Sequence, residues 1–243
     1  MLQVEQLNQF YGESHTLWDL DLNVPEGQCT VLMGRNGVGK TTLLQCIMGL
    51  LPGKSGKIQY QDENILGMAA EKRASIGIGY VPQGRQIFPL MTVEENLQIG
   101  LPARADKSKS IPAFIYELFP VLKEMLGRRG GDLSGGQQQQ LAIGRALVTD
   151  PKLLILDEPT EGIQPNIVAE IGDIITRLNK EIGLTVLLVE QKLPFARRVG
   201  DYFCILDRGR SVAVSYTHLR AHETSSSISY AVFCLKKGGG GGG

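Results

Sequence analysis

The segment GRNGVGKTT, at positions 34–42, combines a flexible glycine-rich backbone with one lysine and two hydroxyl groups. It fits the pattern G-x-x-x-x-G-K-[ST], in which backbone N–H groups surround phosphate oxygens without interference from side chains. Lys40 would neutralise the β- and γ-phosphates, and Thr41 would offer its hydroxyl group to Mg²⁺. The pattern therefore predicts a nucleotide site, whose expected phosphate-binding residues are Gly34, Asn36, Gly37, Gly39, Lys40, Thr41 and Thr42.

Two adjacent carboxylates end an apolar stretch, LLILDEPT, at positions 153–160. Because successive side chains of a strand point in opposite directions, Asp157 and Glu158 would face different ways. Asp157 would then sit beside Mg²⁺ while Glu158 reaches the attacking water, a division of roles that suits phosphoryl transfer. The alternative interpretation is a turn at the end of a strand with two solvated acids. The presence of a phosphate-binding loop in the same chain argues against it.

A second anion site is indicated by LSGGQ at positions 133–137, where small residues precede a helix. The Ser134 hydroxyl group, the Gly135 and Gly136 amides and the positive end of the helix would all attract negative charge. One nucleotide needs only one phosphate loop, so a second anion site indicates a shared ligand.

The elements that would position these residues follow the order of an α/β protein with a parallel sheet. Residues 1–32 alternate like a β meander, and Pro52 and Gly53 would end the helix that follows the phosphate loop. The other expected elements are short strands within 56–81, a mainly helical insertion at about 84–149, strands within 153–160 and 184–190, and a helix at 166–183.

Composition limits the classes of function. The chain has 243 residues, 42% of them hydrophobic, which is enough for one sizeable unit with an inserted lobe. A formal net charge of +0 favours neither nucleic acid nor an acidic membrane surface as a partner. We find no signal peptide, no apolar run long enough for a membrane span and no Cys-x-x-Cys pair. Reduced thiols in a cytosolic setting are expected.

The C-terminal segment, 214–243, breaks the pattern of the rest of the chain and ends in glycines. Its stretches VSYTHLRAHE and ISYAVFCL match translated sequencing-library adapters, with 224–227 spanning the variable index. We interpret 214–243 as a disordered, adapter-derived artefact. The protein proper would then be truncated near Ala213, and His218, His222 and Cys234 would carry no functional information.

The combination of motifs resembles the ABC ATPase family across residues 1–213. The resemblance implies a P-loop NTPase fold, in which a RecA-like parallel sheet core carries an N-terminal antiparallel β lobe and the inserted helical lobe. It also implies ATP and Mg²⁺ as ligands and a head-to-tail dimer. The signature segment Ser134–Gln137 of one subunit would cover the γ-phosphate held by the other.

Further roles come from the resemblance alone. Tyr11 matches the aromatic residue that stacks on adenine; its alternative is a place in the core, for which the neighbouring Phe10 is the better candidate. Gln83 matches the glutamine that touches both Mg²⁺ and the attacking water. Residues 161–164 match the loop that crosses the dimer interface.

One position departs from the family pattern, because LLVEQ places Gln191 where a histidine usually contacts the γ-phosphate. Glutamine donates a hydrogen bond but cannot become a cation near neutral pH, which puts the efficiency of the site in question. By the resemblance, one of the two ATPases of the branched-chain amino acid and urea importers shares this departure. The expected catalytic residues are Gln83, Glu158 and Gln191, and the expected metal ligands are Thr41, Gln83 and Asp157.

Within the family, stretches such as YVPQGRQIFPLMTVEENL and LDEPTEGIQP are similar to the ATP-binding subunit of urea importers, with the branched-chain amino acid importers as the alternative. The resemblance implies import powered through two membrane permeases, a second ABC ATPase in a heterodimer and, indirectly, a periplasmic solute-binding protein. It implies a cytoplasmic chain, peripheral on the inner face of the bacterial cell membrane, with no nucleic-acid partner.

Two other interpretations stay open at this point. A soluble ABC protein of translation or DNA repair usually carries two ATPase units or a long coiled-coil insertion, and neither pattern is present. A binding-only subunit with weak catalysis would be consistent with Gln191, but the presence of Lys40, Asp157 and Glu158 argues against it.

Overall fold

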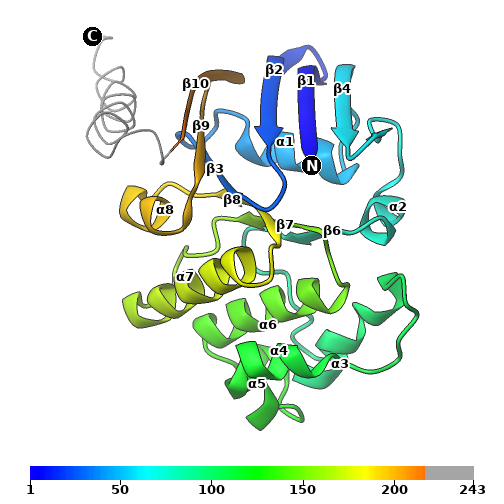
Figure 1. The fold of residues 1–243 in the computed structure, drawn as a ribbon, viewed down its shortest axis with the longest axis vertical. Coiled ribbons are helices and arrows are strands. Elements are labelled where there is room, and N and C mark those ends of the chain that lie inside the picture. The colour runs from blue at the N-terminus through cyan, green and yellow to red at the C-terminus, as the bar shows by residue number, and fades with distance from the viewer. Residues whose placement is uncertain (217–243) are drawn as a thin grey trace. The chain divides into compact units, whose positions relative to one another are not determined.

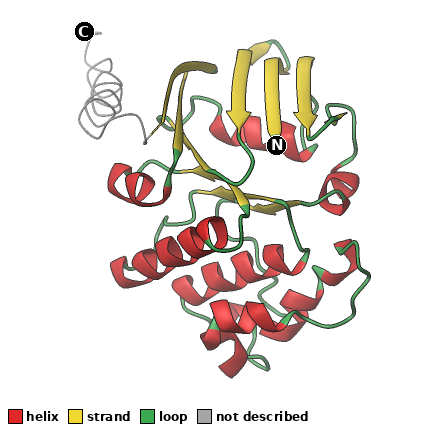
Figure 2. Ribbon diagram, viewed as in Figure 1, coloured by secondary structure: helices red, strands yellow, loops and turns green. Residues whose placement is uncertain are grey.

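Alternating apolar side chains build the first sheet of the computed structural model, which describes residues 1–216 (Figures 1 and 2). Apolar residues of the first two strands, such as Leu2, Leu7 and Leu20, are fully or almost fully buried. The sheet is antiparallel in the order β2-β1-β4-β5, formed by β1 (Leu2–Tyr11), β2 (Ser14–Val24), β4 (Ser55–Tyr60) and β5 (Glu63–Asn64). This confirms the expected antiparallel lobe.

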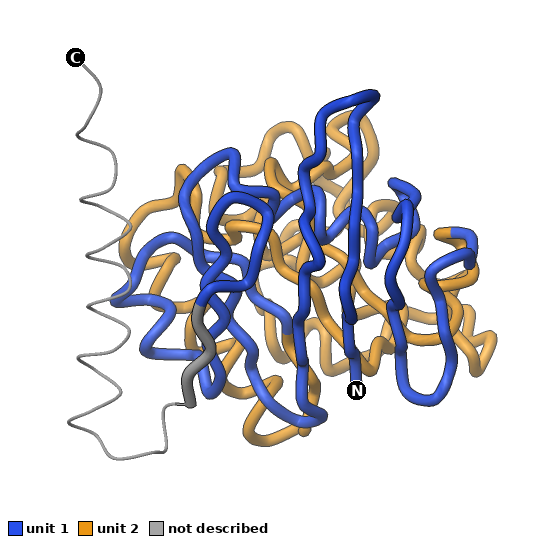
Figure 3. Tube along the Cα trace, turned by 90° about the horizontal axis from the view of Figure 1, so that it is seen from above, with its two compact units in different colours: residues 1–69, 187–243 blue, residues 70–186 orange. Residues whose placement is uncertain are grey.

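The chain forms two compact units, one of residues 1–69 together with the segment from Leu187 onward, the other of residues 70–186 (Figure 3). The first unit also holds strands in the order β10-β9-β3-β8, with β3 parallel to β9 and β10 antiparallel to β9. Its further elements are β3 (Cys29–Met33), α1 (Lys40–Met48), β8 (Thr185–Val189, which straddles the unit boundary), α8 (Leu193–Val199), β9 (Tyr202–Asp207) and β10 (Arg210–Tyr216).

The second unit pairs β6 in parallel with β7 and is otherwise helical. Helices α3 to α6 occupy the segment in which an inserted helical lobe was expected. The elements are α2 (Ala70–Ser75), β6 (Ile78–Val81), α3 (Val93–Gln98), the 3₁₀ turns η1 (Leu101–Ala103) and η2 (Gly130–Asp132), α4 (Ala113–Leu118), α5 (Pro120–Glu124), α6 (Gly135–Val148), β7 (Leu153–Asp157) and α7 (Pro165–Lys180). None of the helices described between residues 1 and 216 combines the length and apolar character that a bilayer span requires.

The elements differ from the sequence prediction in three places. Helix α1 ends at Met48 rather than at Pro52 and Gly53, because Gly49 takes up the left-handed conformation (φ 71°) that closes a helix. Helix α2 was not expected between the short strands. Strand β10 continues through 214–216, past the expected boundary at Ala213, and the rest of the segment interpreted as an artefact lies outside the described residues.

A buried asparagine ties the start of α3 to the loop before it. Asn96 has no exposed surface, and its Oδ1 accepts a hydrogen bond from the Phe88 amide at 2.9 Å. Its Nδ2 donates to the carbonyl groups of Phe88, Met91 and Thr92 at 3.0, 3.3 and 2.9 Å. The side chain therefore fixes residues 88–92, the segment between the Gln83 loop and α3.

We expect Asn96→Ala to lower the free energy of unfolding by about 1–3 kcal/mol, because the substitution leaves buried backbone groups without partners. Urea unfolding of the full chain, followed by circular dichroism, measures the change. The exposed neighbour Gln98 provides the control, since Gln98→Ala should stay within about 0.5 kcal/mol of the parent. Equal stabilities of the parent and Asn96→Ala would contradict this role.

Candidate functional site

The expected phosphate loop joins the end of β3 to the start of α1, inside the first unit. Gly37 and Gly39 have φ values of 80° and 107°, a region that glycine adopts without strain. A Cβ atom on residue 34 would lie 2.5 Å from the carbonyl oxygen of Leu206, so only glycine fits there. Glycine is therefore required by the loop's own geometry, and its bare backbone is open to close approach by a ligand.

Lys40 is buried at the first turn of α1, with only 5% of its surface exposed. Its Nζ donates to the carbonyl oxygens of Gly34 and Arg35, both at 2.9 Å, so the side chain reaches back to the start of the loop. Thr41 follows on the exposed side of the helix, and Thr42 is buried. An ammonium group and a helix N-terminus thus converge on one loop, an arrangement that attracts phosphate.

Gln191, predicted from the resemblance, lies at the same loop. Its Nε2 donates to Asn36 Oδ1 at 2.6 Å, across 155 positions of sequence. The buried Glu190 positions it, because its Oε1 accepts hydrogen bonds from the backbone amides of Gln191 and Lys192 at 2.8 and 3.0 Å. The sequence analysis missed Glu190, for which no local pattern gives a signal.

Tyr11 is half exposed, and its hydroxyl group lies 3.5 Å from Thr42 Oγ1 and 3.4 Å from Gln45 Oε1 of α1. The expectation that Phe10 is a core residue is wrong. Phe10 is 39% exposed and stacks on His15, with ring centroids 4.0 Å apart. Register shifts around Gln9 break the alternation of β1, so both aromatic side chains reach the surface.

The paired carboxylates lie in the second unit, at the end of β7. Asp157 is buried, with 2% exposed. Burial and the nearby charge of Asp157 raise the pKa of the Tyr80 phenol well above its usual value, so Tyr80 stays neutral. Glu158 leaves the strand with φ 48°, in a region where residues other than glycine are strained. Asp157 is therefore the last residue of the strand, and the chain turns at Glu158.

The LSGGQ motif forms the start of α6 in the second unit, and each of its polar side chains has a structural partner. Ser134 Oγ accepts from the Gln137 amide at 3.3 Å, while Gln137 Oε1 accepts from the Ser134 amide at 2.9 Å. This is a capping box, which satisfies backbone donors at a helix start. A Cβ atom on Gly136 would lie 2.8 Å from Ile167 Cγ2, so α7 packs against a bare backbone here.

Gln83 lies exposed on the loop that follows β6, also in the second unit. Its Nε2 donates to Glu161 Oε2 at 2.8 Å, which joins it to the loop 161–164. Arg85 was not predicted as a site residue, yet its guanidinium group reaches Gln138 Oε1 at 3.2 Å and the Glu161 carbonyl oxygen at 3.4 Å. The structure thus brings together Gln83, the 161–164 loop and the start of α6.

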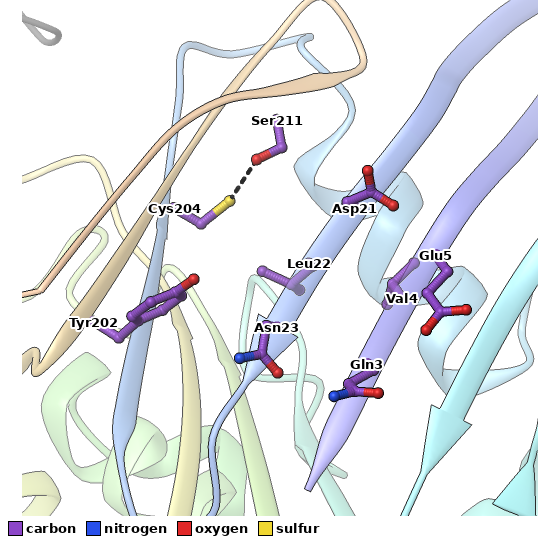
Figure 4. Close-up of a pocket in the computed structure, with 9 residues that line it drawn as sticks. All are labelled: Gln3, Val4, Glu5, Asp21, Leu22, Asn23, Tyr202, Cys204 and Ser211. Carbon is purple, nitrogen blue, oxygen red and sulfur yellow. Dashed lines mark hydrogen bonds between the residues drawn. The ribbon is translucent and has the colours of Figure 1, made fainter.

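Each unit also contains a cavity. One, of about 300 Å³ in the first unit, is bordered by β1, β2, β9 and β10, and includes Tyr202 and the Cys204 thiol 3.2 Å from Ser211 Oγ (Figure 4). None of the predicted site residues lines it. The other, of about 530 Å³ in the second unit, is lined by residues that include Phe119 and the signature residues Ser134 and Gln137.

Comparisons with known proteins identify the family of the chain. A family model described as ABC transporter matches residues 17–161. The high-affinity branched-chain amino acid transport ATP-binding protein BraG of Pseudomonas aeruginosa is 41% identical over 230 residues, covering 94% of each chain. The probable branched-chain amino acid transport ATP-binding protein LivF of Archaeoglobus fulgidus is 37% identical over 211 residues, covering 86% of this chain and 89% of that protein.

Solved structures extend the agreement to the fold. The ADP conformation of an ATP-binding cassette from an ABC transporter has a TM-score of 0.83 at 28% identity, covering 97% of this chain and 98% of that chain. A dimeric bacterial ABC transporter cassette has a TM-score of 0.79 at 26% identity, covering 89% and 98%. The chain therefore belongs to the ABC transporter family, as an ATP-binding subunit whose ATPase activity is coupled to transport.

Proposed function

We propose that the chain is the ATP-hydrolysing subunit of an ABC importer, acting through membrane permease partners on the inner face of the cell membrane. The observation that carries this proposal is the phosphate loop, where Lys40 bonds the loop carbonyl groups at the start of α1. The carboxylates and the capped signature helix in the second unit supply further groups of the family's chemistry, and Gln191 stands at the phosphate loop in place of the usual histidine.

The residues fit ATP and Mg²⁺ by their chemistry. The bare glycine backbone and the Lys40 ammonium group suit the phosphates, and the exposed ring of Tyr11 suits stacking on adenine. Thr41, Gln83 and Asp157 offer oxygen atoms, the ligands that Mg²⁺ prefers.

In the proposed mechanism each side chain has a separate task. Mg²⁺, when bound, neutralises charge on the β- and γ-phosphates. Asp157 and Thr41 would hold the metal ion. Gln83 and Glu158 orient the attacking water, and Glu158 accepts the proton of that water. Gln191 donates a neutral hydrogen bond toward the γ-phosphate. The signature segment of a second subunit closes the site, as the family resemblance implies. The dimeric cassette that this chain resembles supports the dimer itself.

We expect Glu158→Gln to lower ATP turnover by about 10²–10⁴-fold, because a positioned general base typically accelerates a reaction by that factor. ATP binding should persist, since the amide keeps the shape of the carboxyl group. Lys40→Ala should instead weaken nucleotide binding itself, because the ammonium group facing the phosphates is lost. Turnover and equilibrium ATP binding, measured in the assembled transporter, separate the two effects, and parental turnover in Glu158→Gln would refute the assignment.

The proposed working unit is a heterodimer with unequal sites. A homodimer of this chain would place Gln191 in both sites, whereas by the resemblance the sister ATPase carries the histidine. A lost charge-assisted hydrogen bond is worth roughly 1.5–3 kcal/mol, or about ten- to hundredfold in rate if it acts only in the transition state. The sister's site, closed by Ser134–Gln137 of this chain, should therefore be the faster one.

Substitutions in this chain should then have unequal effects. Gly135→Asp adds a negative charge and a side chain at the anion site offered to the sister, and should damage the faster site. Lys40→Ala should damage the slower one. Turnover of the two ATPases co-expressed with their permeases provides the measurement. Equal losses, or full activity from a purified homodimer of this chain, would contradict the proposal.

Two solutes are candidates for the transported molecule. The BraG and LivF relatives support branched-chain amino acids, while the urea assignment rests on the resemblance of short stretches around Gln83 and Asp157. An ATPase subunit does not touch the solute, so the choice depends on its permease partners. The branched-chain amino acid importer is the better supported of the two.

We expect ATP-dependent uptake of labelled leucine by proteoliposomes that contain the chain, its permeases and its sister ATPase, supplied with the binding protein. The matched control is the same preparation with Glu158→Gln, which should abolish uptake because it blocks turnover. Uptake of labelled urea in parallel distinguishes the second candidate. Transport of neither solute, with ATPase activity intact, would contradict both assignments.

A further inference from the structure

The contact between Gln83 and Glu161 joins two exposed side chains that lie 78 positions apart in the sequence. Both residues belong to the second unit, one on the loop after β6 and the other on the loop after β7. An isolated hydrogen bond between exposed side chains adds little to stability. We expect this hydrogen bond to act mainly on the orientation of the Gln83 side chain.

The chemistry of the two groups determines how the amide must lie. A carboxylate only accepts hydrogen bonds, whereas the end of a glutamine has one donor group and one acceptor oxygen. The Gln83 NH₂ group therefore faces Glu161, at 2.8 Å, and its Oε1 occupies the other branch of the amide. Mg²⁺ binds oxygen and cannot use an amide NH₂ group. Glu161 thus selects the orientation in which Gln83 has an oxygen available for the metal.

The backbone that carries Glu161 is held from two sides. Its amide donates to the Glu158 carbonyl oxygen at 3.1 Å, closing a turn directly after the proposed general base. Its own carbonyl oxygen accepts from the guanidinium group of Arg85 at 3.4 Å. Arg85 also reaches Gln138 of α6, and its strained backbone (φ 69°) indicates that the surroundings enforce this position. The carboxylate therefore meets Gln83 from a restrained loop.

We propose that Glu161 is a positioning residue that holds the Gln83 amide with Oε1 presented to the metal ion of the ATP site. The proposal rests on the proposed function, because the metal contact of Gln83 is itself part of that function. Glu161 does not touch the metal; it acts through Gln83. Groups that orient a metal ligand in this way typically change metal affinity by 10–100-fold when they are removed.

The test uses Mn²⁺ as a spectroscopic substitute for Mg²⁺. Electron paramagnetic resonance measures the affinity of Mn²⁺ for the full chain in the presence of ATP. All variants carry Glu158→Gln, so that ATP is not hydrolysed during the measurement. Glu161→Ala should weaken Mn²⁺ binding about tenfold. Glu161→Gln keeps an acceptor oxygen at the same reach and should recover most of the affinity. Glu181→Ala is the matched control, since Glu181 pairs with Arg177 on the exposed end of α7 and should leave Mn²⁺ affinity unchanged.

Two further readouts separate positioning from a loss of structure. Binding of ATP in the presence of EDTA and the melting temperature should be unchanged in Glu161→Ala. The double variant with Gln83→Ala should bind Mn²⁺ no more weakly than Gln83→Ala alone, because both changes remove one contact. Additive losses would overturn the proposal, as they would mean that Glu161 acts independently of Gln83.

The controls also distinguish this inference from the proposed function. If Gln83→Ala weakens Mn²⁺ binding but Glu161→Ala does not, the positioning role of Glu161 is wrong and the metal role of Gln83 stands. If Gln83→Ala itself leaves Mn²⁺ affinity unchanged, the metal role of Gln83 is wrong, and the positioning role is overturned with it.

Discussion

A buried ammonium group, that of Lys40, is the constraint around which the phosphate loop of the first unit is organised. Burying the Lys40 charge is costly unless its donors find acceptors, and the carbonyl groups of Gly34 and Arg35 supply them. The loop also passes so close to β9 that a Cβ atom on residue 34 would collide with the Leu206 carbonyl oxygen. Gly34 therefore allows the loop before α1 to lie close to strand β9. Gln191, which follows the end of β8, contacts the same loop.

In the second unit, several loop residues are held in backbone conformations that are unfavourable for residues other than glycine. Arg85, Gln86 and Glu158 all have positive φ values, each at a cost of roughly 1–3 kcal/mol. Arg85 connects its loop both to α6 and to the Glu161 backbone, and the capping box fixes the start of α6. Glu158, the proposed general base, is itself one of these strained residues, and backbone strain at a functional residue is typical of catalytic sites.

The sequence was sufficient for those parts of the fold that depend on local patterns. The glycine spacing of residues 34–42, the apolar strand before Asp157 and the period of α7 each appear in one continuous stretch, and the structure has the expected elements there. The Ser134 and Gln137 capping box was also readable from its spacing, although the motif was interpreted only as an anion site. Helix α2 and the end of α1 at Gly49 were missed because short helices and left-handed caps leave weak local signals.

Contacts between distant residues could not be predicted in the same way. Nothing local to Gln191 indicates Asn36, and nothing local to Gln83 indicates Glu161, since these pairs form only when strands far apart in the sequence end near one another. Phe10 was taken as the better core candidate, but the register shifts in β1, which are set by pairing with β2, leave it partly exposed. Roles taken from the resemblance supplied the candidates, and the structure supplied their neighbours.

The most direct test of the central claim is a crystal structure of the full chain with Mg²⁺ and a non-hydrolysable ATP analogue. The account predicts that the β- and γ-phosphates lie against the backbone amides of residues 36–42. The Lys40 Nζ should then exchange the carbonyl oxygens of Gly34 and Arg35 for phosphate oxygens. A nucleotide bound elsewhere, with Lys40 still bonded to those two carbonyl groups, would contradict it.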